Sequence, residues 1–209
     1  MAEKIKIWGR TTSINVHKAL IALSECNLDY DQEVIGRQHG GTFQPEFCRL
    51  NPNGNIPALA DGDFILWESN AIVAYICEKY GSAALCPEDV GQRALCNQWM
   101  IWQITSVYPH LRPLYMNAIR PDEYDGGEAL LKTAPGKMMK SLDILEAQLA
   151  GKDFIMGKDF TMADIPVGAV LKRWYALRGE DDRHPNVLAW QTRLNQRPSF
   201  VAHTNSELE

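Results

Sequence analysis

Residues 51–59, Asn-Pro-Asn-Gly-Asn-Ile-Pro-Ala-Leu, and residues 67–72, Trp-Glu-Ser-Asn-Ala-Ile, decide how this chain folds. The first four of them, 51–54, are a dense turn signal that leads into a short apolar run. A hairpin-type turn at 61–63 separates this run from a second one at 64–67. Apolar residues at helical spacing follow as far as Tyr80. The stretch therefore predicts two strands joined by a hairpin, and then a helix.

Glu68 and Ser69 stand at the start of that predicted helix. A helix start exposes free N–H groups and a positive partial charge, which suit a ligand carboxylate, and a hydroxyl there can add a hydrogen bond. Glu68 suits a ligand ammonium group, so a ligand with an α-amino acid head fits both residues. Taken alone, however, the two residues are more typical of an ordinary helix cap.

The Ile56-Pro57 pair shifts this balance toward a binding site. An X-Pro bond between a turn and a strand is a candidate cis peptide bond. A cis bond would turn the backbone of Ile56 outward, where an extended peptide can pair with its N–H and C=O groups. The same stretch therefore offers both a peptide-pairing edge and a site for a zwitterionic head.

Composition limits the function classes. The 209 residues suggest one or two domains, and a hydrophobic fraction of 45% is ample for a core. The net charge is −5 and basic residues are scattered, which argues against a nucleic-acid partner. There is no apolar leader at the N-terminus and no run long enough to cross a membrane, so we expect a cytoplasmic protein. The cysteines lack metal-ligand spacing, and we expect reduced thiols and no metal; they are Cys26, Cys48, Cys77, Cys86 and Cys96.

The chain divides into two halves. In the first, residues 4–8 and 30–35 have the pattern of strands, and a helix begins at Ser13. In the second we find no convincing strand. The predicted helices there are 90–117, bent or interrupted near Pro109 and Pro113, then 137–149, one that follows the capping box at 161–164, and one opened by His184-Pro185. We predict an α/β domain over residues 1–82 and an all-α domain over residues 87–209.

Four motifs, at 13–18, 51–57, 68–72 and 161–164, resemble the cytosolic glutathione transferase superfamily in their order and spacing. The resemblance covers nearly the whole chain. It implies a thioredoxin-like N-terminal domain, a helical C-terminal domain, a homodimer, a role in detoxification, and glutathione as co-substrate with no permanently bound cofactor. The motif that begins with Ser13 is similar to the bacterial members related to the phi and theta classes, which use a serine in place of a tyrosine.

Ser13 is the first candidate for catalysis. A free thiol has a pKa of about 8.5, and only the thiolate attacks well. Ser13 can donate its hydroxyl to the sulfur at a helix start, Asn15 can donate its amide N–H₂ from the same turn, and Arg10 can add a cation. In serine-type relatives the residue that matches Ser13 stabilises the thiolate, and in some related groups the equivalent of Asn15 helps or takes over. The competing interpretation is that Ser13 is only a helix cap.

The resemblance also implies the other contacts with glutathione. Ile56, which precedes Pro57, is expected to pair through its backbone with the cysteinyl part, and Glu68 and Ser69 to hold the γ-glutamyl head. Gln38 and His39 lie in the loop where relatives bind the glycyl carboxylate, although a solvated loop histidine is an equally good interpretation of His39.

The site for the second substrate is expected between the domains, and Asp164 outside it. Asp164 resembles the family's buried capping aspartate, a structural residue. We expect the electrophile to be hydrophobic or aromatic, and a wall of Tyr, Trp and Arg would suit a planar or anionic one. The candidate residues are Thr11 and Thr12 for the floor, and Tyr108, Arg112, Tyr115 and Trp174 for the wall.

Three function classes compete at this stage. The first is a transferase that adds the glutathione thiolate to an electrophilic carbon. The second is a glutathione-dependent peroxidase or disulfide reductase, which the serine at position 13 disfavours because thiol-transferring relatives often have a cysteine there. The third is a non-catalytic binding module on the same fold. The presence of Ser13, Ile56, Glu68 and Ser69 together places this third class last.

Overall fold

The N-terminal half folds around a four-stranded sheet. The structure is a computed structural model and describes residues 4–179 and 182–205. The elements of this half are β1 (Ile5–Trp8), α1 (Ile14–Glu25), β2 (Tyr30–Glu33), the 3₁₀ turn η1 (Arg37–His39), α2 (Pro45–Leu50), β3 (Ala58–Asp61), β4 (Phe64–Trp67) and α3 (Ser69–Tyr80). Both short strands predicted before the hairpin are present, and β2 ends two residues earlier than expected.

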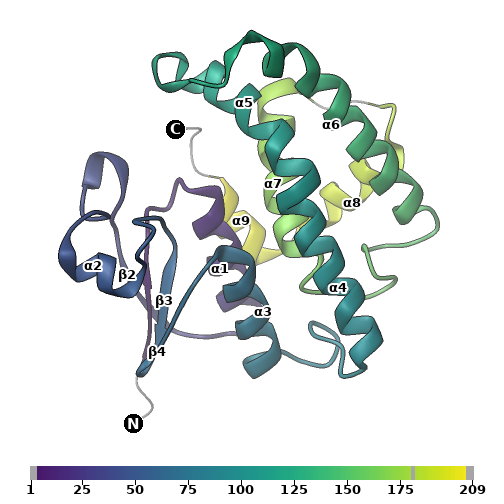
Figure 1. Cartoon of the computed structure of the whole chain (residues 1–209). Coiled ribbons are helices and arrows are strands. Elements are labelled where there is room, and N and C mark those ends of the chain that lie inside the picture. Colours follow the sequence, from purple (N-terminus) through teal and green to yellow (C-terminus); the bar gives the residue numbers. More distant parts are fainter. Residues whose placement is uncertain (1–3, 180–181, 206–209) are drawn as a thin grey trace.

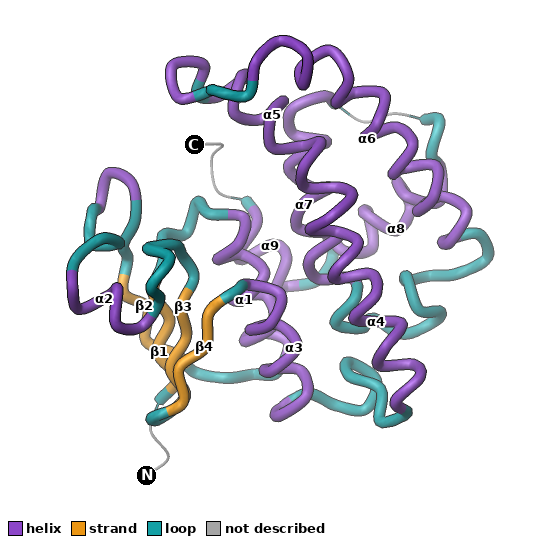
Figure 2. The backbone as a smooth tube through the Cα atoms, in the orientation of Figure 1, coloured by secondary structure: helices purple, strands orange, loops and turns teal. Residues whose placement is uncertain are grey.

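The sheet is mixed, in the order β2-β1-β3-β4. β1 runs parallel to β2 and antiparallel to β3, with Ile7 opposite Leu59. Helices α1 and α3 cover one face and α2 lies on the other (Figures 1 and 2). Phe47 of α2 packs there against Trp8 and Ala58. The central strands of the sheet are therefore covered on both faces, and the strand ends are left to form loops that can carry a site.

The C-terminal half is helical. Its elements are α4 (Val90–Trp102), the π-helical turn η2 (Gln103–Val107), α5 (Tyr108–Ile119), the 3₁₀ turn η3 (Pro121–Glu123), α6 (Gly127–Leu149), α7 (Asp164–Arg178), α8 (Pro185–Asn195) and α9 (Pro198–Thr204). Within the described ranges, its extended pairing is limited to one isolated bridge, between Phe154 and Gly157. None of the helices described is long and apolar enough to cross a membrane.

Two helix predictions differ from the structure. The expected bend or interruption near Pro109 is the π-helical turn at 103–107, which ends just before that proline, whereas α5 continues through Pro113. Pro109 lies in the first turn of α5, where its missing N–H has no intrahelical partner to lose. Helix α6 begins at Gly127 instead of Lys137, because it accommodates Pro135 in its interior.

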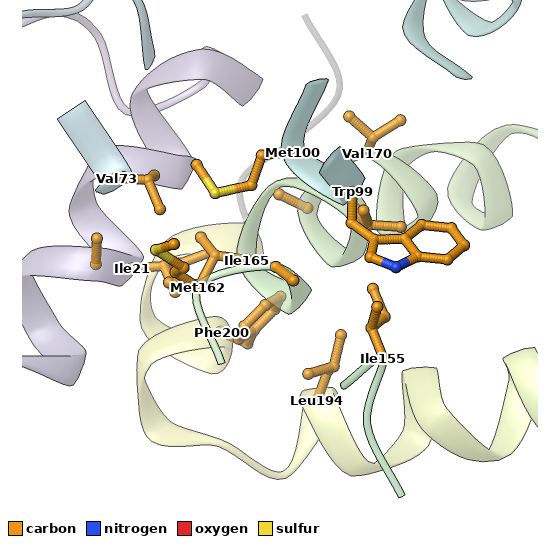
Figure 3. Close-up of a cluster of buried hydrophobic side chains, with 14 of the residues drawn as sticks. Ile21, Val73, Trp99, Met100, Ile155, Met162, Ile165, Val170, Leu194 and Phe200 are labelled. Atoms are coloured by element: carbon orange, nitrogen blue, oxygen red, sulfur yellow. The ribbon is translucent and has the colours of Figure 1, made fainter. Parts of the chain in front are cut away.

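One hydrophobic core joins the two halves. It contains Ile21 and Val73 from the α/β half together with Met100, Ile165 and Phe200 from the helical half. Figure 3 shows these side chains gathered where α1, α3, α4, α7 and α9 meet. Because the two halves share this core, the space between them is held in a fixed shape.

Asp164 supports the start of the buried helix α7. Its carboxylate is fully buried and accepts hydrogen bonds from the N–H of Ile155 at 2.9 Å, the N–H of Thr161 at 2.9 Å and Trp190 Nε1 at 2.8 Å. Burial raises the pKa of Asp164, and the hydrogen bonds oppose that rise. The expected capping box is modified, because the Thr161 hydroxyl accepts from the N–H of Ala163 and not of Asp164.

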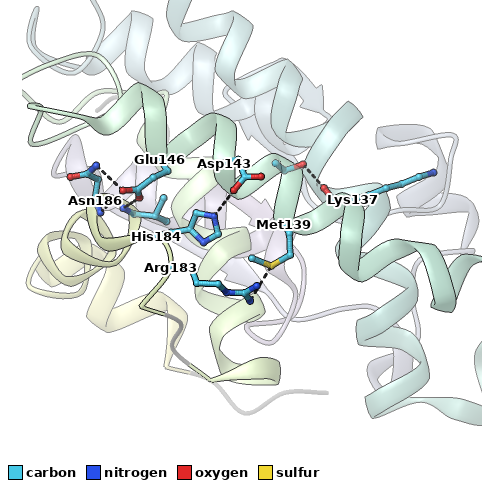
Figure 4. A network of polar contacts seen from close by, with 9 residues as sticks. Lys137, Met139, Asp143, Glu146, Arg183, His184 and Asn186 are labelled. Atoms are coloured by element: carbon cyan, nitrogen blue, oxygen red, sulfur yellow. Dashed lines mark hydrogen bonds and ion pairs between the residues drawn. The ribbon is translucent and has the colours of Figure 1, made fainter.

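Helix α8 is capped from a different element. Glu146 of α6 accepts from the backbone N–H of Asn186 at 3.1 Å and of Val187 at 2.9 Å, both in the first turn of α8. The adjacent His184 contacts Asp143 of α6 at 2.9 Å (Figure 4). These bonds satisfy the free N–H groups of the helix start and fix α8 against α6.

The last described helix returns to the N-terminal half. Helix α9 packs on α1, beside it in Figure 1. Arg197 Nε donates to Glu25 at 2.9 Å, and the Ser24 hydroxyl lies 2.7 Å from His203 Nε2. Helix α1 is therefore enclosed by elements from both ends of the described chain.

Candidate active site

A cleft of about 660 Å³ lies between the two halves, at the start of α1. The lining residues come from the loops after β1 and β2, from the first turn of α1, from the turn before β3, and from α5, η3, α7 and the residue between α5 and η3. They are Arg10, Ser13, Ile14, Asn15, Arg37, Gln38, Asn55, Ile56, Tyr108, Leu111, Arg112, Tyr115, Met116, Arg120, Glu123 and Arg173. Five of the sixteen are arginines, so the cleft is positive on a chain whose net charge is −5.

Ser13 is the N-cap residue of α1, but its hydroxyl does not cap the helix. The residue has extended backbone angles, and its C=O accepts the first helical bond from the N–H of His17 at 2.9 Å. Its hydroxyl forms no hydrogen bond within the described part of the chain, although the side chain is only 8% exposed. The hydroxyl is therefore uncommitted at a helix start that faces the cleft, which is the position for binding an anion.

A polar chain runs from Asn15 into the interface between the halves. The Ser69 hydroxyl lies 3.4 Å from Asn15 Oδ1 and 3.5 Å from the ammonium of Lys18. Lys18 is only 2% exposed and donates to Gln103 Oε1, 2.9 Å away in the π-helical turn. Burial lowers the pKa of Lys18 to about 7. The two predicted residues Asn15 and Ser69 are thus in contact, and a buried lysine lies behind them.

The turn before β3 presents the backbone of Ile56. Asn51 is buried and donates its side-chain amide to the carbonyl of Asn55 at 2.7 Å, which closes the turn. The Ile56-Pro57 bond is cis, as the sequence suggested. The N–H and C=O of Ile56 take part in no hydrogen bond with another described residue. They remain able to pair with an extended ligand.

Glu68 has an unusual backbone at the start of α3. Its φ is +71°, in the left-handed region that non-glycine residues rarely enter. The side chain is exposed and forms no capping bond with the helix. Such strain, about 1–3 kcal/mol, is often retained at ligand sites. Glu68 and Ser69 are outside the residues that line the cleft, and they adjoin it through the contact between Ser69 and Asn15.

The loop after β2 reaches the cleft through η1. Gln38 lines the cleft, whereas His39 is exposed and lies outside the lining set. Arg37 of this turn forms an ion pair at 2.6 Å with Glu123 of η3 in the helical half. This ion pair bridges the cleft at its edge.

The structure divides the residues predicted for the acceptor site into three groups. Tyr108, Arg112 and Tyr115, all on α5, line the cleft. Thr11 and Thr12 are outside the lining set, and the carbonyl of Thr12 accepts from Arg173. Trp174 points away from the cleft: it is 4% exposed and lines a second cavity of about 550 Å³ with Arg178 and Met139.

Sequence reasoning missed several residues of the helical wall. They are Leu111, Met116, Arg120, Glu123 and Arg173. Leu111 and Met116 share the cleft face of α5 with residues that were predicted, so helical spacing could have found them. Arg173 is next to Trp174 in the sequence, but nothing in the sequence indicates which of the two faces the cleft.

Other reactive groups lie outside the cleft. His17 is buried and its pKa is lowered to about 4, chiefly by desolvation, so the neutral ring donates to the carbonyl of Thr11. None of the five cysteines lines the cleft. Within the described residues, no cluster of three or more His, Cys, Asp or Glu side chains could hold a metal ion.

Comparison with known proteins matches this architecture over both halves. Residues 3–78 match the family model for the N-terminal domain of glutathione S-transferase, and residues 105–198 match the model for its C-terminal domain. Glutathione S-transferase GstB of Escherichia coli is 32% identical over 197 residues, which cover 93% of this chain and 95% of the relative. Glutathione S-transferase D7 of Drosophila melanogaster is 33% identical over 186 residues, covering 87% and 79%.

Solved structures agree with these matches and confirm the resemblance stated from the motifs. The theta-class glutathione S-transferase of Xanthomonas axonopodis pv. citri, a structure with glutathione bound, has a TM-score of 0.91 and 35% identity and covers 100% of both chains. The thioredoxin-like domain with a helical C-terminal domain is therefore confirmed as the fold. On this evidence the chain belongs to the glutathione S-transferase family.

Proposed function

We propose that this glutathione S-transferase holds glutathione with its sulfur at Ser13 and transfers it, as the thiolate, to a small electrophile. The observation that carries the proposal is the Ser13 hydroxyl, which lies at the start of α1 in the cleft and is not used as a cap. An N-cap serine normally bonds to an N–H of its own helix. A hydroxyl that does not is available to donate to a ligand.

The surrounding groups support the placement of the whole tripeptide. The unpaired N–H and C=O of Ile56 suit the cysteinyl backbone. Glu68 and Ser69, at the start of α3, suit the ammonium and carboxylate of the γ-glutamyl head. Arg10 and Gln38 line the cleft nearest the loop after β2, and either side chain can bond to the glycyl carboxylate. Glutathione is thus a co-substrate that spans the α/β half.

The expected effect on the thiol follows from hydrogen-bond energies. A hydrogen bond to a charged group is worth about 1.5–3 kcal/mol, which corresponds to a pKa lowered by about 1–2. The start of α1 adds a favourable potential of about 0.3–1 kcal/mol. Ser13 with the helix can therefore bring the thiol of glutathione from about 8.5 to about 6.5.

The test is a pH titration of protein-bound glutathione, followed by thiolate ultraviolet absorbance. Ser13→Ala should raise the pKa of the bound thiol by at least about 1, while Ser13→Thr, which keeps the hydroxyl, should not. Asn15→Ala should have the smaller effect. If Asn15→Ala alone raises the pKa, the catalytic role belongs to Asn15, and a bound thiol with an unshifted pKa would contradict thiolate activation altogether.

The acceptor is a small, hydrophobic or aromatic electrophile. Tyr108, Leu111 and Met116 of α5 give the cleft an apolar wall on its helical side. Tyr108→Ala should raise the KM for the acceptor several-fold more than the KM for glutathione. Equal changes in both constants would remove Tyr108 from the acceptor site.

Peroxide or disulfide reduction remains the second activity to assay. A mechanism through a protein cysteine finds no support, because the cleft lining contains none. Reduction by the bound thiolate itself would need the same Ser13. Parallel assays with an aryl halide and with a peroxide, both on wild type and Ser13→Ala, separate the two activities.

A homodimer is part of the same proposal. Large apolar side chains are exposed near the α/β edge and on α4, among them Phe43 at 82%, Val90 at 71% and Ile101 at 60%. Apolar exposure of this kind is typical of an interface. Light scattering should give twice the chain mass, and Phe43→Ser should shift the mass toward the monomer. A wild-type monomer at micromolar concentration would contradict the dimer.

A further inference from the structure

The residues that line the cleft carry more positive than negative charge. Its lining contains five arginines and one acid, Glu123, and that acid is paired with Arg37. Of the remaining cations, Arg173 reaches the start of α1 from the helical half, because its guanidinium donates to the carbonyl of Thr12 at 2.9 Å. An arginine has five N–H donors, so this bond leaves most of them available.

Arg173 is held in place without a counter-ion. No carboxylate of the described residues lies within salt-bridge distance of it. Its guanidinium stacks on the ring of Tyr115, 4.5 Å from the ring centroid. Burial is the main cause that lowers the pKa of Arg173, and the charge of Arg120 adds to it. A cation in this position is incompletely solvated, and an anion beside it would be bound more strongly than in water.

Tyr115 gives an independent sign that the site is incomplete. Its side chain is 6% exposed, it lines the cleft, and its hydroxyl is buried without a hydrogen-bond partner in the described part of the chain. An unsatisfied buried hydroxyl costs about 1–3 kcal/mol. Such a group next to an unpaired cation is typical of a ligand subsite. Arg112, exposed on the same helix, adds a second cation at the cleft.

We propose that Arg173, stacked on Tyr115, forms a subsite for an anionic group of the electrophile, so that the preferred acceptor carries a carboxylate besides its electrophilic carbon. This inference rests on the proposed function. The carboxylates of glutathione are expected on the α/β side, at Ser69 and near Gln38. Arg173 belongs to α7, on the helical side of Ser13, where the acceptor binds.

A matched pair of acceptors tests the charge. Chlorodinitrobenzoate and its neutral carboxamide have the same shape around the reacting carbon. In both, the glutathione thiolate forms the C–S bond, the C–Cl bond breaks, chloride leaves, and the thiol proton passes to solvent. With each rate divided by its uncatalysed rate, wild type should prefer the benzoate by about 10- to 100-fold in kcat/KM, the worth of a charge-assisted hydrogen bond.

Variants assign the preference to Arg173. Arg173→Met should abolish it by raising the KM for the benzoate, with the glutathione KM and the pKa of the bound thiol unchanged. Arg173→Lys should keep part of the preference. Arg178→Met is the matched control, since Arg178 lies on the same helix but lines the second cavity. If Arg173→Met slows both acceptors equally and raises the thiol pKa, Arg173 acts on the sulfur and the subsite is refuted.

Calorimetry with the unreactive dinitrobenzoate separates this inference from the proposed function. Glutathione-loaded wild type should bind it at least about 10-fold more tightly than dinitrobenzamide, and Arg173→Met should bind both alike. That result would support the subsite even if neither chlorinated acceptor were conjugated. A failure to conjugate them would count only against the transferase mechanism. Equal binding of the two compounds by wild type would overturn the subsite whatever the activity.

Discussion

Replacing Lys18 should change how the stability of the protein depends on pH. Lys18 is 2% exposed, its ammonium group donates to Gln103 Oε1 at 2.9 Å, and no carboxylate of the described residues forms an ion pair with it. Desolvation lowers its pKa from 10.5 to about 7, while the charge of Glu68 opposes this effect. Lys18→Met removes the titrating group and keeps most of its volume. Gln103 Oε1 retains the Asn70 amide as a donor at 3.2 Å.

The sign follows from the protons that each state binds. The unfolded chain keeps the Lys18 proton up to about pH 10.5, whereas the folded chain releases it from about pH 7. Below pH 7 the folded state bears the full cost of a buried charge, and this cost falls as the pH rises. Relative to Lys18→Met, the unfolding free energy of wild type should rise by about 2–3 kcal/mol between pH 6 and pH 9.

Urea denaturation at matched protein concentration, at several pH values in that range, measures this difference. Other titrating groups contribute equally to both proteins and cancel. Measured against Lys18→Gln, the unfolding free energy of wild type should rise by the same amount, because glutamine also lacks the titrating group. Only the pH-independent part of the difference should change between the two variants. A wild-type-minus-variant difference that stays constant within about 0.5 kcal/mol would refute the argument that Lys18 is buried and desolvated.

Three further sets of substitutions test other parts of the structure. Asp164→Ala should lower the unfolding free energy by more than about 4 kcal/mol in urea titrations, since it leaves buried donors unpaired, and Asp164→Asn should cost less. Gly54→Ala should lower the unfolding free energy by more than Gly40→Ala. Both glycines have φ near +60°, but only the Cβ at Gly54 would meet a carbon of the Phe43 ring, at 2.7 Å. Equal decreases in unfolding free energy would mean that backbone strain accounts for the whole effect. Arg37→Ala and Glu123→Ala, in a double-mutant cycle, should give a coupling below about 1 kcal/mol, because the pair is partly exposed.

The sequence predicted the parts of the site that depend on local chemistry. The turn at 51–54, the cis bond before Pro57 and the hydroxyls of Ser13 and Ser69 at helix starts all follow from short motifs. The sheet and most helix positions followed from periodicity. Glycine and proline signals were less reliable inside α5 and α6, where tertiary packing keeps the helix intact through its prolines.

The helical wall of the cleft could not be predicted in the same way. Adjacent residues on a helix point about 100° apart, so choosing between Arg173 and Trp174 requires the rotation of α7 to be known to better than about 100°. Helix α7 is buried around most of its circumference from Asp164 to Leu171, and therefore it has no clear apolar face from which to read that rotation. The pairing of Lys18 with Gln103 depends on the π-helical turn, which no sequence pattern indicated.

The position of α9 on α1 has a consequence for biosynthesis. Glu25 and Arg197 are separated by 172 positions in the sequence, and at about 5–20 residues per second a ribosome needs about 9–34 s to make the residues between them. During that time the sheet and α3 can form, but α1 lacks the helix that covers its outer side. The N-terminal half therefore leaves the ribosome with apolar surface exposed, and α1 reaches its final environment only after residues 197–204 have been translated.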